Sequence, residues 1–314
     1  MGWQTTARPD SAPAMGAFHH GAHSRHSSAP TRAALVSAGV SRSCSNSSVV
    51  GYNAYSTTNH FPDTERHTGR RYQPGRADKR DGGGLDVKVP ADSTNPADLA
   101  EFVDQFVVHY DVCGTSETCF RVLHDERHLS VQFMIDVDGT IFQTMDVREQ
   151  AWHAAKANRR SVGVEIAHIG AYPPDNMSRI EQWYDEDPLG PHIAYDKIEG
   201  RLRTPGYIGR PARPELISGR IHGTELVQYD YTPEQYDSLV KLAAALCRAL
   251  PGLEPDAPRD ANGEVRTDAL SPAEYDAFKG ILGHNHVTTR KQDPGPAFDW
   301  ERFLKDVRRE LARP

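Results

Sequence analysis

The sequence lacks any long hydrophobic run. Of its 314 residues 38% are apolar, and no stretch approaches the roughly 20 consecutive apolar residues that a membrane-spanning helix needs. An integral membrane protein is therefore not expected. The one stretch that resembles an export signal, residues 33–40 behind Arg32, is weakly apolar and lies too far from Met1 to predict a signal peptide.

Regularly spaced apolar residues are missing from the first 83 positions. Ser, Gly, His and Arg dominate there, and three consecutive glycines, Gly82–Gly84, end the segment. Such a composition cannot bury enough apolar surface to offset the entropy of folding. We therefore expect residues 1–84 to form a disordered, low-complexity arm and residues 85–314 to form the folded domain.

Positive charge is in the minority overall but not in this arm. Residues 1–83 hold ten Lys and Arg against five Asp and Glu, whereas the formal net charge of the whole chain is −7. A basic arm on an acidic body can attract a polyanion. The arm lacks the interleaved aromatic and basic residues that nucleic-acid-binding surfaces use, so nucleic acid is not the expected partner.

Cysteine is scarce, with four in the chain. Cys113 and Cys119 lie six positions apart after a strand-like run, where a loop turning into a helix can bring them within disulfide reach. Two buried or free thiols are the alternative, and the spacing does not decide between them. No second Cys/His pair has a matching spacing, so a structural zinc ion at this pair is not expected.

What is present after residue 85 is an alternation of short strands and helices. β-Branched apolar runs predict strands at 106–108, 161–167 and 281–283, and a turn at Asp138-Gly139 predicts a hairpin within 131–143. Capping residues and helical spacing predict helices over 116–128, 232–250 and 299–311. The expected fold is a single α/β domain with a mixed central sheet flanked by helices.

Residues 168–231 interrupt this alternation with a stretch rich in Pro, Gly and charged residues. Loops of this length inside a compact domain are usually functional or disordered. We expect an ordered insertion that forms one wall of the functional site; a surface loop without substrate contacts is the alternative. Its side chains suited to sugar rings and carboxylates are Trp183, Tyr184, Arg201 and Arg203.

Two histidines and an aspartate occupy positions where side chains can converge. His109 ends the buried run 106–108, His284 ends the run 281–283, and Asp293 precedes a proline. Two imidazoles and a carboxylate, with a fourth position open to water, are the donor set of a catalytic zinc site. A histidine at a strand end can also bond to a backbone carbonyl, so the prediction depends on the three residues together.

Two further charged residues can act beside such a metal. Glu165 lies on the face of strand 161–167 opposite the apolar side chains, so its carboxylate can accept a proton from a metal-activated water. Lys291 stands two positions before Asp293 and can reach the same cleft.

Six segments, in this order, resemble the zinc-dependent N-acetylmuramoyl-L-alanine amidases of the AmpD and peptidoglycan-recognition-protein superfamily: FVVHYD, QFMIDVDGTIFQ, AWHA, SVGVEIAH, YTPEQYDSLVKLAAAL and GHNHVTTRKQDPGPAFDW. The resemblance covers about residues 100–312 without the insertion. It implies a single amidase domain that uses one zinc ion and acts on peptidoglycan or muropeptides.

The resemblance also implies roles for single residues. His153, in AWHA, matches a histidine beside the cleft that contacts the substrate or supports the metal ligands. The spacing of Cys113 and Cys119 resembles a disulfide of peptidoglycan-recognition proteins, which favours the bridge. The implied zinc ligands are His109, His284 and Asp293, with Glu165 as the catalytic carboxylate and Lys291 as the cation that stabilises the transition state.

The sequence also departs from the family. The interval from His284 to Asp293 is one residue shorter than in the AmpD group, and His286 is an extra histidine that could compete for the metal. A tyrosine that some members carry in the hairpin strand is replaced near Val131. The arm and the insertion match no part of the family.

The expected reaction is hydrolysis of the amide bond between N-acetylmuramic acid and L-alanine. A non-catalytic recognition module is the alternative, because members of the superfamily that lack a zinc ligand bind muropeptides without cleaving them. No ligand is missing here. A peptidoglycan substrate favours a secreted or periplasmic location, and the weak export signal leaves a cytoplasmic one open.

Overall fold

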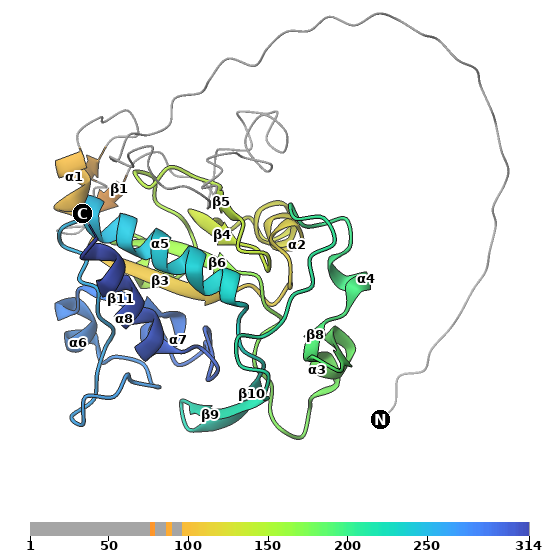
Figure 1. Ribbon diagram of the computed structural model, residues 1–314. Coiled ribbons are helices and arrows are strands. Elements are labelled where there is room, and N and C mark those ends of the chain that lie inside the picture. The colour runs from red at the N-terminus through yellow and green to blue at the C-terminus, as the bar shows by residue number, and fades with distance from the viewer. Residues whose placement is uncertain (1–75, 79–85, 90–95, 314) are drawn as a thin grey trace, which may run out of the picture. The chain divides into compact units, whose positions relative to one another are not determined.

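The computed structural model describes residues 76–78, 86–89 and 96–313 (Figure 1). The predicted arm lies outside the described residues, with the exception of Arg76–Asp78, which form strand β1. This strand pairs antiparallel with β2, Asp86–Val89. The two strands of this pair lie on either side of the expected domain boundary near residue 85.

Five strands form the central sheet, in the order β11-β3-β6-β4-β5. Their bounds are Gln105–Tyr110 for β3, Phe133–Ile135 for β4, Ile141–Gln143 for β5, Ser161–Ile166 for β6 and Gly280–Gly283 for β11. The first four in spatial order are parallel, and β5 returns antiparallel to β4 through the predicted hairpin. The sheet is therefore mixed, as predicted, and its parallel strands all end at one edge.

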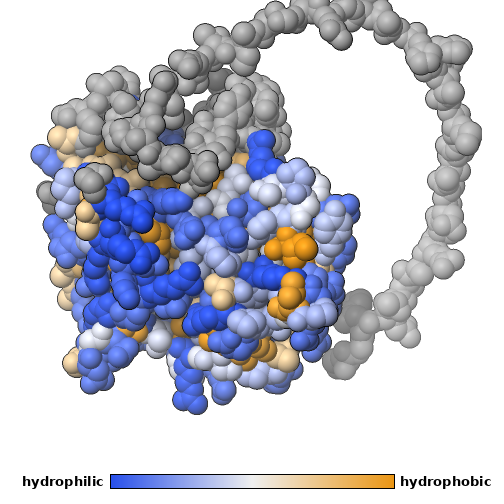
Figure 2. Space-filling model, viewed as in Figure 1, coloured by the Kyte–Doolittle hydropathy of each residue, from blue (hydrophilic) through white to orange (hydrophobic). Residues whose placement is uncertain are grey.

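The two longest described helices, α5 (Pro233–Ala249) and α8 (Trp300–Leu311), cover one face of the sheet (Figure 1). Figure 2 shows a mainly hydrophilic surface over them, because their apolar sides turn inward. Side chains alternate between the two faces of a strand, so every second residue joins this core. The core includes Phe106, Val108, Val162, Val164, Leu239, Leu242, Phe303 and Leu304.

Shorter elements cover the opposite face. Helix α2 (Ser116–Phe120) continues into the π-helix Arg121–Glu126, and both pack near Met134 of β4. Helix α6 (Pro272–Ala277) packs near Val107 of β3. Outside the insertion, the remaining described helical segments are α1 (Pro96–Ala100), the 3-10 turn Ala155–Ala157 and α7 (His284–Val287). None of the helices in the described ranges is both long enough and apolar enough to cross a bilayer.

The insertion is ordered and has elements of its own. These are α3 (Ser178–Trp183), the β7–β8 hairpin (Tyr184–Asp187 and Gly190–Ile193), α4 (Tyr195–Ile198) and the β9–β10 hairpin (Ile217–Ile221 and Thr224–Gln228). The ring of Trp183 covers Gly114, which has a φ of +78° and no room for a Cβ atom. The insertion is therefore packed against the loop that follows β3.

Two helices begin with the same capping arrangement but differ in burial. In α5, Thr232 Oγ1 accepts from Gln235 N at 3.1 Å, and Gln235 Oε1 accepts from Thr232 N at 3.0 Å. The buried Thr232 hydroxyl also donates to Val137 O at 2.8 Å. In α6 the pair is Ser271 and Glu274, both exposed. The α5 cap therefore joins its helix to the hairpin loop of the sheet.

We expect Thr232→Ala to lower the free energy of unfolding by about 1–2 kcal/mol, because it removes a helix cap together with a buried hydrogen bond. Ser271→Ala is the matched control, with an expected loss below about 1 kcal/mol because its surroundings are exposed. Urea unfolding followed by circular dichroism measures both values. An equal loss in the two variants would show that the α5 cap has no role beyond its own helix.

Candidate metal centre and active site

Strands β3 and β6 bring His109 and Glu165 together. The two residues are direct partners in the parallel register of these strands. Since Val108 and Val164 face the core under α5, their neighbours His109 and Glu165 point to the opposite face. Both side chains are buried, and the position predicted for Glu165 on its strand is the one observed.

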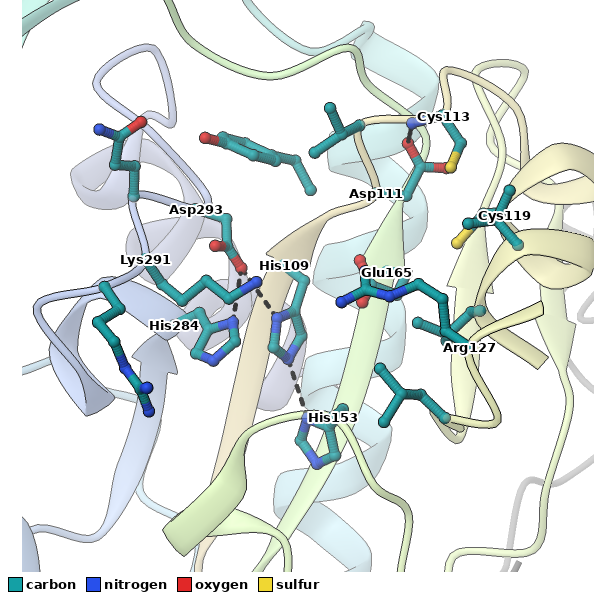
Figure 3. Close-up of a pocket in the computed structure, with 17 residues that line it drawn as sticks. His109, Asp111, Cys113, Cys119, Arg127, His153, Glu165, His284, Lys291 and Asp293 are labelled. Carbon is teal, nitrogen blue, oxygen red and sulfur yellow. Dashed lines mark hydrogen bonds and ion pairs between the residues drawn. The ribbon is translucent and has the colours of Figure 1, made fainter. Parts of the chain in front are cut away.

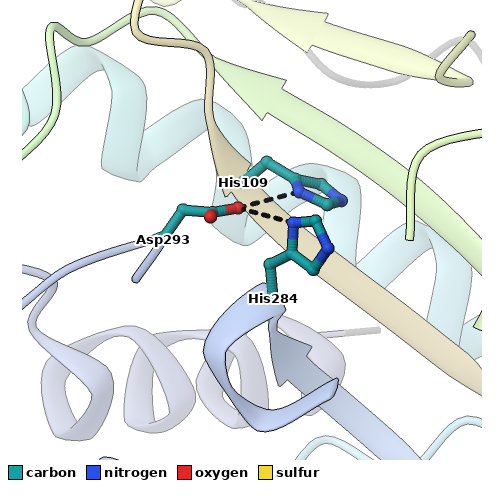
Figure 4. Close-up of side chains that lie close together, drawn as sticks. All are labelled: His109, His284 and Asp293. Atoms are coloured by element: carbon teal, nitrogen blue, oxygen red, sulfur yellow. Dashed lines mark hydrogen bonds and ion pairs between the residues drawn. The ribbon is translucent and has the colours of Figure 1, made fainter. Parts of the chain in front are cut away.

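His284 and Asp293 reach the same place from the segment after β11. His284 follows this strand directly and begins α7, while Asp293 lies nine positions further along the chain. Asp293 Oδ2 lies 2.9 Å from His109 Nδ1 and 3.1 Å from His284 Nδ1 (Figure 4). One donor atom from each residue lies within 4.8 Å of the other two. The structure thus assembles the three residues predicted as ligands.

The electrostatics of this cluster suit metal binding. Burial and the nearby His284 lower the pKa of His109 to about 4. Burial alone would raise the pKa of Asp293, but His284 and the hydrogen bonds from His109 and His284 lower it below its usual range. At neutral pH the cluster therefore presents a neutral imidazole at His109 and an ionised carboxylate at Asp293, the forms that ligate metals.

The donor set fits zinc better than a hard cation. Two imidazoles and one carboxylate are borderline-soft ligands, whereas Mg²⁺ and Ca²⁺ prefer oxygen ligands alone. Three protein ligands also leave one position of a tetrahedral zinc site for water. The residues present therefore fit a catalytic rather than a structural zinc ion.

Glu165 and Lys291 border the same cluster. Burial, with added repulsion from Asp293 and Asp111, raises the pKa of Glu165 well above its ordinary value, and Lys291 partly offsets this effect. Figure 3 shows the side chain of Lys291 extending toward His109. A buried carboxyl group at this position can accept a proton and return it.

A pocket of about 260 Å³ opens over these groups (Figure 3). It is lined by the three candidate ligands, His153, Glu165 and Lys291, and by apolar side chains such as Val112, Val122 and Leu129. Arg127 and Arg290 also line it. Arg290 directly precedes Lys291 in the C-terminal motif, whereas Arg127 comes from a separate segment that only the tertiary fold brings to this pocket.

Asp111 is another pocket residue that the sequence did not single out. Its Oδ1 accepts backbone N–H bonds from Cys113 at 2.8 Å, Gly114 at 2.9 Å and His168 at 3.0 Å. Burial raises its pKa to about 7 even though these bonds oppose the change. Asp followed three positions later by Gly is a turn signal that could have predicted the first two bonds. The residue fixes the loop between β3 and α2.

The predicted disulfide is absent. Cys113 and Cys119 are both free, and the Cys119 thiol is hydrogen-bonded to Cys113, which raises the pKa of Cys119 together with burial. The loop between them is closed by other contacts: Asp111 accepts from its backbone, and Trp183 packs against Gly114. The prediction of a bridge was therefore wrong, because the spacing brings the thiols near each other without joining them.

His286 does not compete for the metal. It is fully buried, its Nδ1 accepts from Gly283 N at 2.9 Å, and its Nε2 lies 2.6 Å from the carbonyl of Arg266. Backbone groups therefore use both ring nitrogens. Burial lowers the pKa of His286 to about 4, so the ring stays neutral and holds the start of α7 in place.

The insertion supports the site from outside the pocket. This segment is described throughout, and none of its residues lines the pocket. Arg201 donates to Thr118 Oγ1 at 3.2 Å, and Arg203 lies over the ring of Phe142. The expectation that Trp183, Tyr184, Arg201 and Arg203 form a pocket wall is thus wrong.

On the other side of the pocket, the insertion holds the segment that carries Lys291 and Asp293. His222 Nε2 lies 2.9 Å from the carbonyl of Lys291, and Tyr231 donates to the carbonyl of Pro294 at 2.7 Å. These contacts fix the backbone on both sides of Asp293.

Several solved structures are similar to the chain. AmpD, solved as its selenomethionine derivative, has 18% identity and a TM-score of 0.33, over 66% of this chain and 86% of AmpD. AmpDh3 from Pseudomonas aeruginosa has 15% identity and a TM-score of 0.38, over 68% of this chain and 69% of its own. Drosophila peptidoglycan recognition protein SA has 12% identity and a TM-score of 0.31, over 65% of this chain and 78% of its own. A comparison with curated proteins finds no match.

The sequence of the chain identifies its family. The profile of one family, described as N-acetylmuramoyl-L-alanine amidase, matches residues 99–296. The match covers more than half of the chain and includes His109, Glu165, His284 and Asp293. The chain therefore belongs to the N-acetylmuramoyl-L-alanine amidase family.

Proposed function

We propose that the protein is a zinc-dependent amidase that hydrolyses the bond between N-acetylmuramic acid and L-alanine in peptidoglycan or muropeptides. The observation that supports this most is the convergence of His109, His284 and Asp293 beside the buried carboxyl group of Glu165 in one pocket. Such a substrate lies in the cell wall, so we also propose that the protein acts outside the cytoplasm. The free Cys113 and Cys119 lend no support to that location.

The chemistry divides among five side chains and one ion. His109, His284 and Asp293 would hold zinc, which when bound polarises the amide carbonyl and acidifies the attacking water. Glu165 accepts the proton of that water and returns it to the departing amine. Lys291 stabilises the negative charge that develops on the carbonyl oxygen.

The proposal requires that stem peptides be released from the glycan. We expect the zinc-loaded protein to convert purified sacculi into free stem peptides and peptide-free glycan strands, which mass spectrometry distinguishes. Glycosidase or peptidase products would point to a different reaction. Retention of the protein on sacculi without any released peptide would instead support recognition without catalysis, and would reject the proposed hydrolysis.

His109→Ala should remove both zinc and activity, because the two remaining protein ligands cannot complete the site. His192→Ala is the control, since His192 lies in β8 and does not line the pocket. Metal analysis of the dialysed variants by mass spectrometry gives the zinc content of each. Stoichiometric zinc in His109→Ala would show that the metal is held elsewhere.

Glu165→Gln should retain zinc while turnover falls by about 10²- to 10⁴-fold, the usual contribution of a general base. The amide keeps the size of the side chain but cannot accept the proton. Glu149→Gln is the matched control, because Glu149 is another buried residue and lies outside the pocket. A near-native rate in Glu165→Gln would assign proton transfer to another group.

A further inference from the structure

His153 lies between a candidate metal ligand and a buried serine. Its Nδ1 is 2.9 Å from His109 Nε2, and the two rings meet edge-on with centroids 5.1 Å apart. Its Nε2 is 3.2 Å from Ser161 Oγ. The Ser161 hydroxyl in turn donates to the carbonyl of Ala157 at 2.6 Å. These contacts form one continuous chain from the backbone to His109.

The single proton of the Ser161 hydroxyl sets the direction of this chain. The short bond to the Ala157 carbonyl uses that proton, so Ser161 Oγ is left as an acceptor for His153. His153 then carries its proton on Nε2 and offers Nδ1 as an acceptor. In the zinc-loaded protein His109 would in turn donate from Nε2, which leaves the lone pair of Nδ1 for the metal in place of the hydrogen bond to Asp293.

The fold also fixes where the His153 ring lies. The ring covers Gly163 of β6, where an added Cβ atom would lie 2.6 Å from His153 Nδ1. The backbone of the same turn is held by Asn158 Oδ1, which accepts from His153 N at 3.1 Å and from Ala154 N at 2.7 Å. Two features therefore fix the position of the ring. Gly163 has no side chain below it, and Asn158 closes the turn beside it.

We propose that Ser161 is a positioning residue that acts through His153 on His109. By fixing the tautomer of His153 it directs the Nδ1 lone pair of His109 toward the point where Asp293 and His284 converge. The inference rests on the proposed zinc site and extends it by two layers of side chains. Groups that orient a ligating histidine in this way typically contribute about 10–100-fold to metal affinity.

The first test is zinc affinity, measured by competition with a chromogenic chelator. Ser161→Ala should weaken zinc binding by about 10–100-fold, and Ser161→Thr, which keeps the hydroxyl, should recover most of it. Ser238→Ala is the matched control, because Ser238 is also buried and donates to a backbone carbonyl at 2.6 Å, but does not line the pocket. Gly163→Ala, which displaces the His153 ring but leaves Ser161 in place, should weaken zinc binding as well.

The second test reads the tautomers directly. In the zinc-loaded protein labelled with ¹⁵N-histidine, two-bond proton–nitrogen spectra should show His153 protonated on Nε2, and Ser161→Ala should move part of that population to Nδ1. Signals are assigned with His153→Gln and His109→Gln. Unchanged tautomers in Ser161→Ala would overturn the inference.

Neither measurement depends on amidase activity, so the two proposals fail separately. A wild-type protein that binds no zinc would reject the proposed function. A wild-type protein that binds zinc, with Ser161→Ala binding it equally well, would reject only the positioning role of Ser161.

Discussion

The parallel register of β3 with β6 is the constraint on which the site depends. It places His109 beside Glu165, and the parallel β11 ends at the same edge of the sheet and delivers His284. Because side chains alternate with a period of two, a slip of one residue would turn His109 into the core under α5 and bring Val108 to the pocket. The apolar partners of α5 and α8 therefore determine the position of the polar site, although none of them is part of it.

Residues with a local signal were predicted correctly from the sequence. The period-two pattern of 161–167 put Glu165 on the polar face, and the capping residues Thr232 and Asp299 marked the starts of α5 and α8. Such features depend on a few neighbouring residues, so a sequence displays them directly. The candidate ligands were found because each stands at a strand end or before a turn, positions that side chains from distant segments can share.

Predictions failed where residue type was used in place of position. Trp183 and Arg201 have side chains suited to a carbohydrate site, but the fold uses them to hold the loop and helix beside the pocket. Cys113 and Cys119 have a spacing suited to a disulfide, yet their loop is closed by the Asp111 hydrogen bonds. His286 has the chemistry of a metal ligand, but both of its ring nitrogens form hydrogen bonds with backbone groups. In each case a hydrogen bond or a packing contact of the folded chain decided the role.

The insertion illustrates the difference between a loop that contacts substrate and a loop that holds a site in place. A loop that contacts substrate must leave polar groups exposed for it, whereas a loop that holds a site in place can satisfy its own. Here His222 and Tyr231 bond to backbone carbonyls on either side of Asp293, and Trp183 packs on the far side of the pocket against Gly114. Metal ligands on loops need such support, because small displacements of a ligand weaken a site that requires fixed geometry. The insertion therefore supports the candidate metal centre through contacts on two sides of the pocket, and none of its residues lines that pocket.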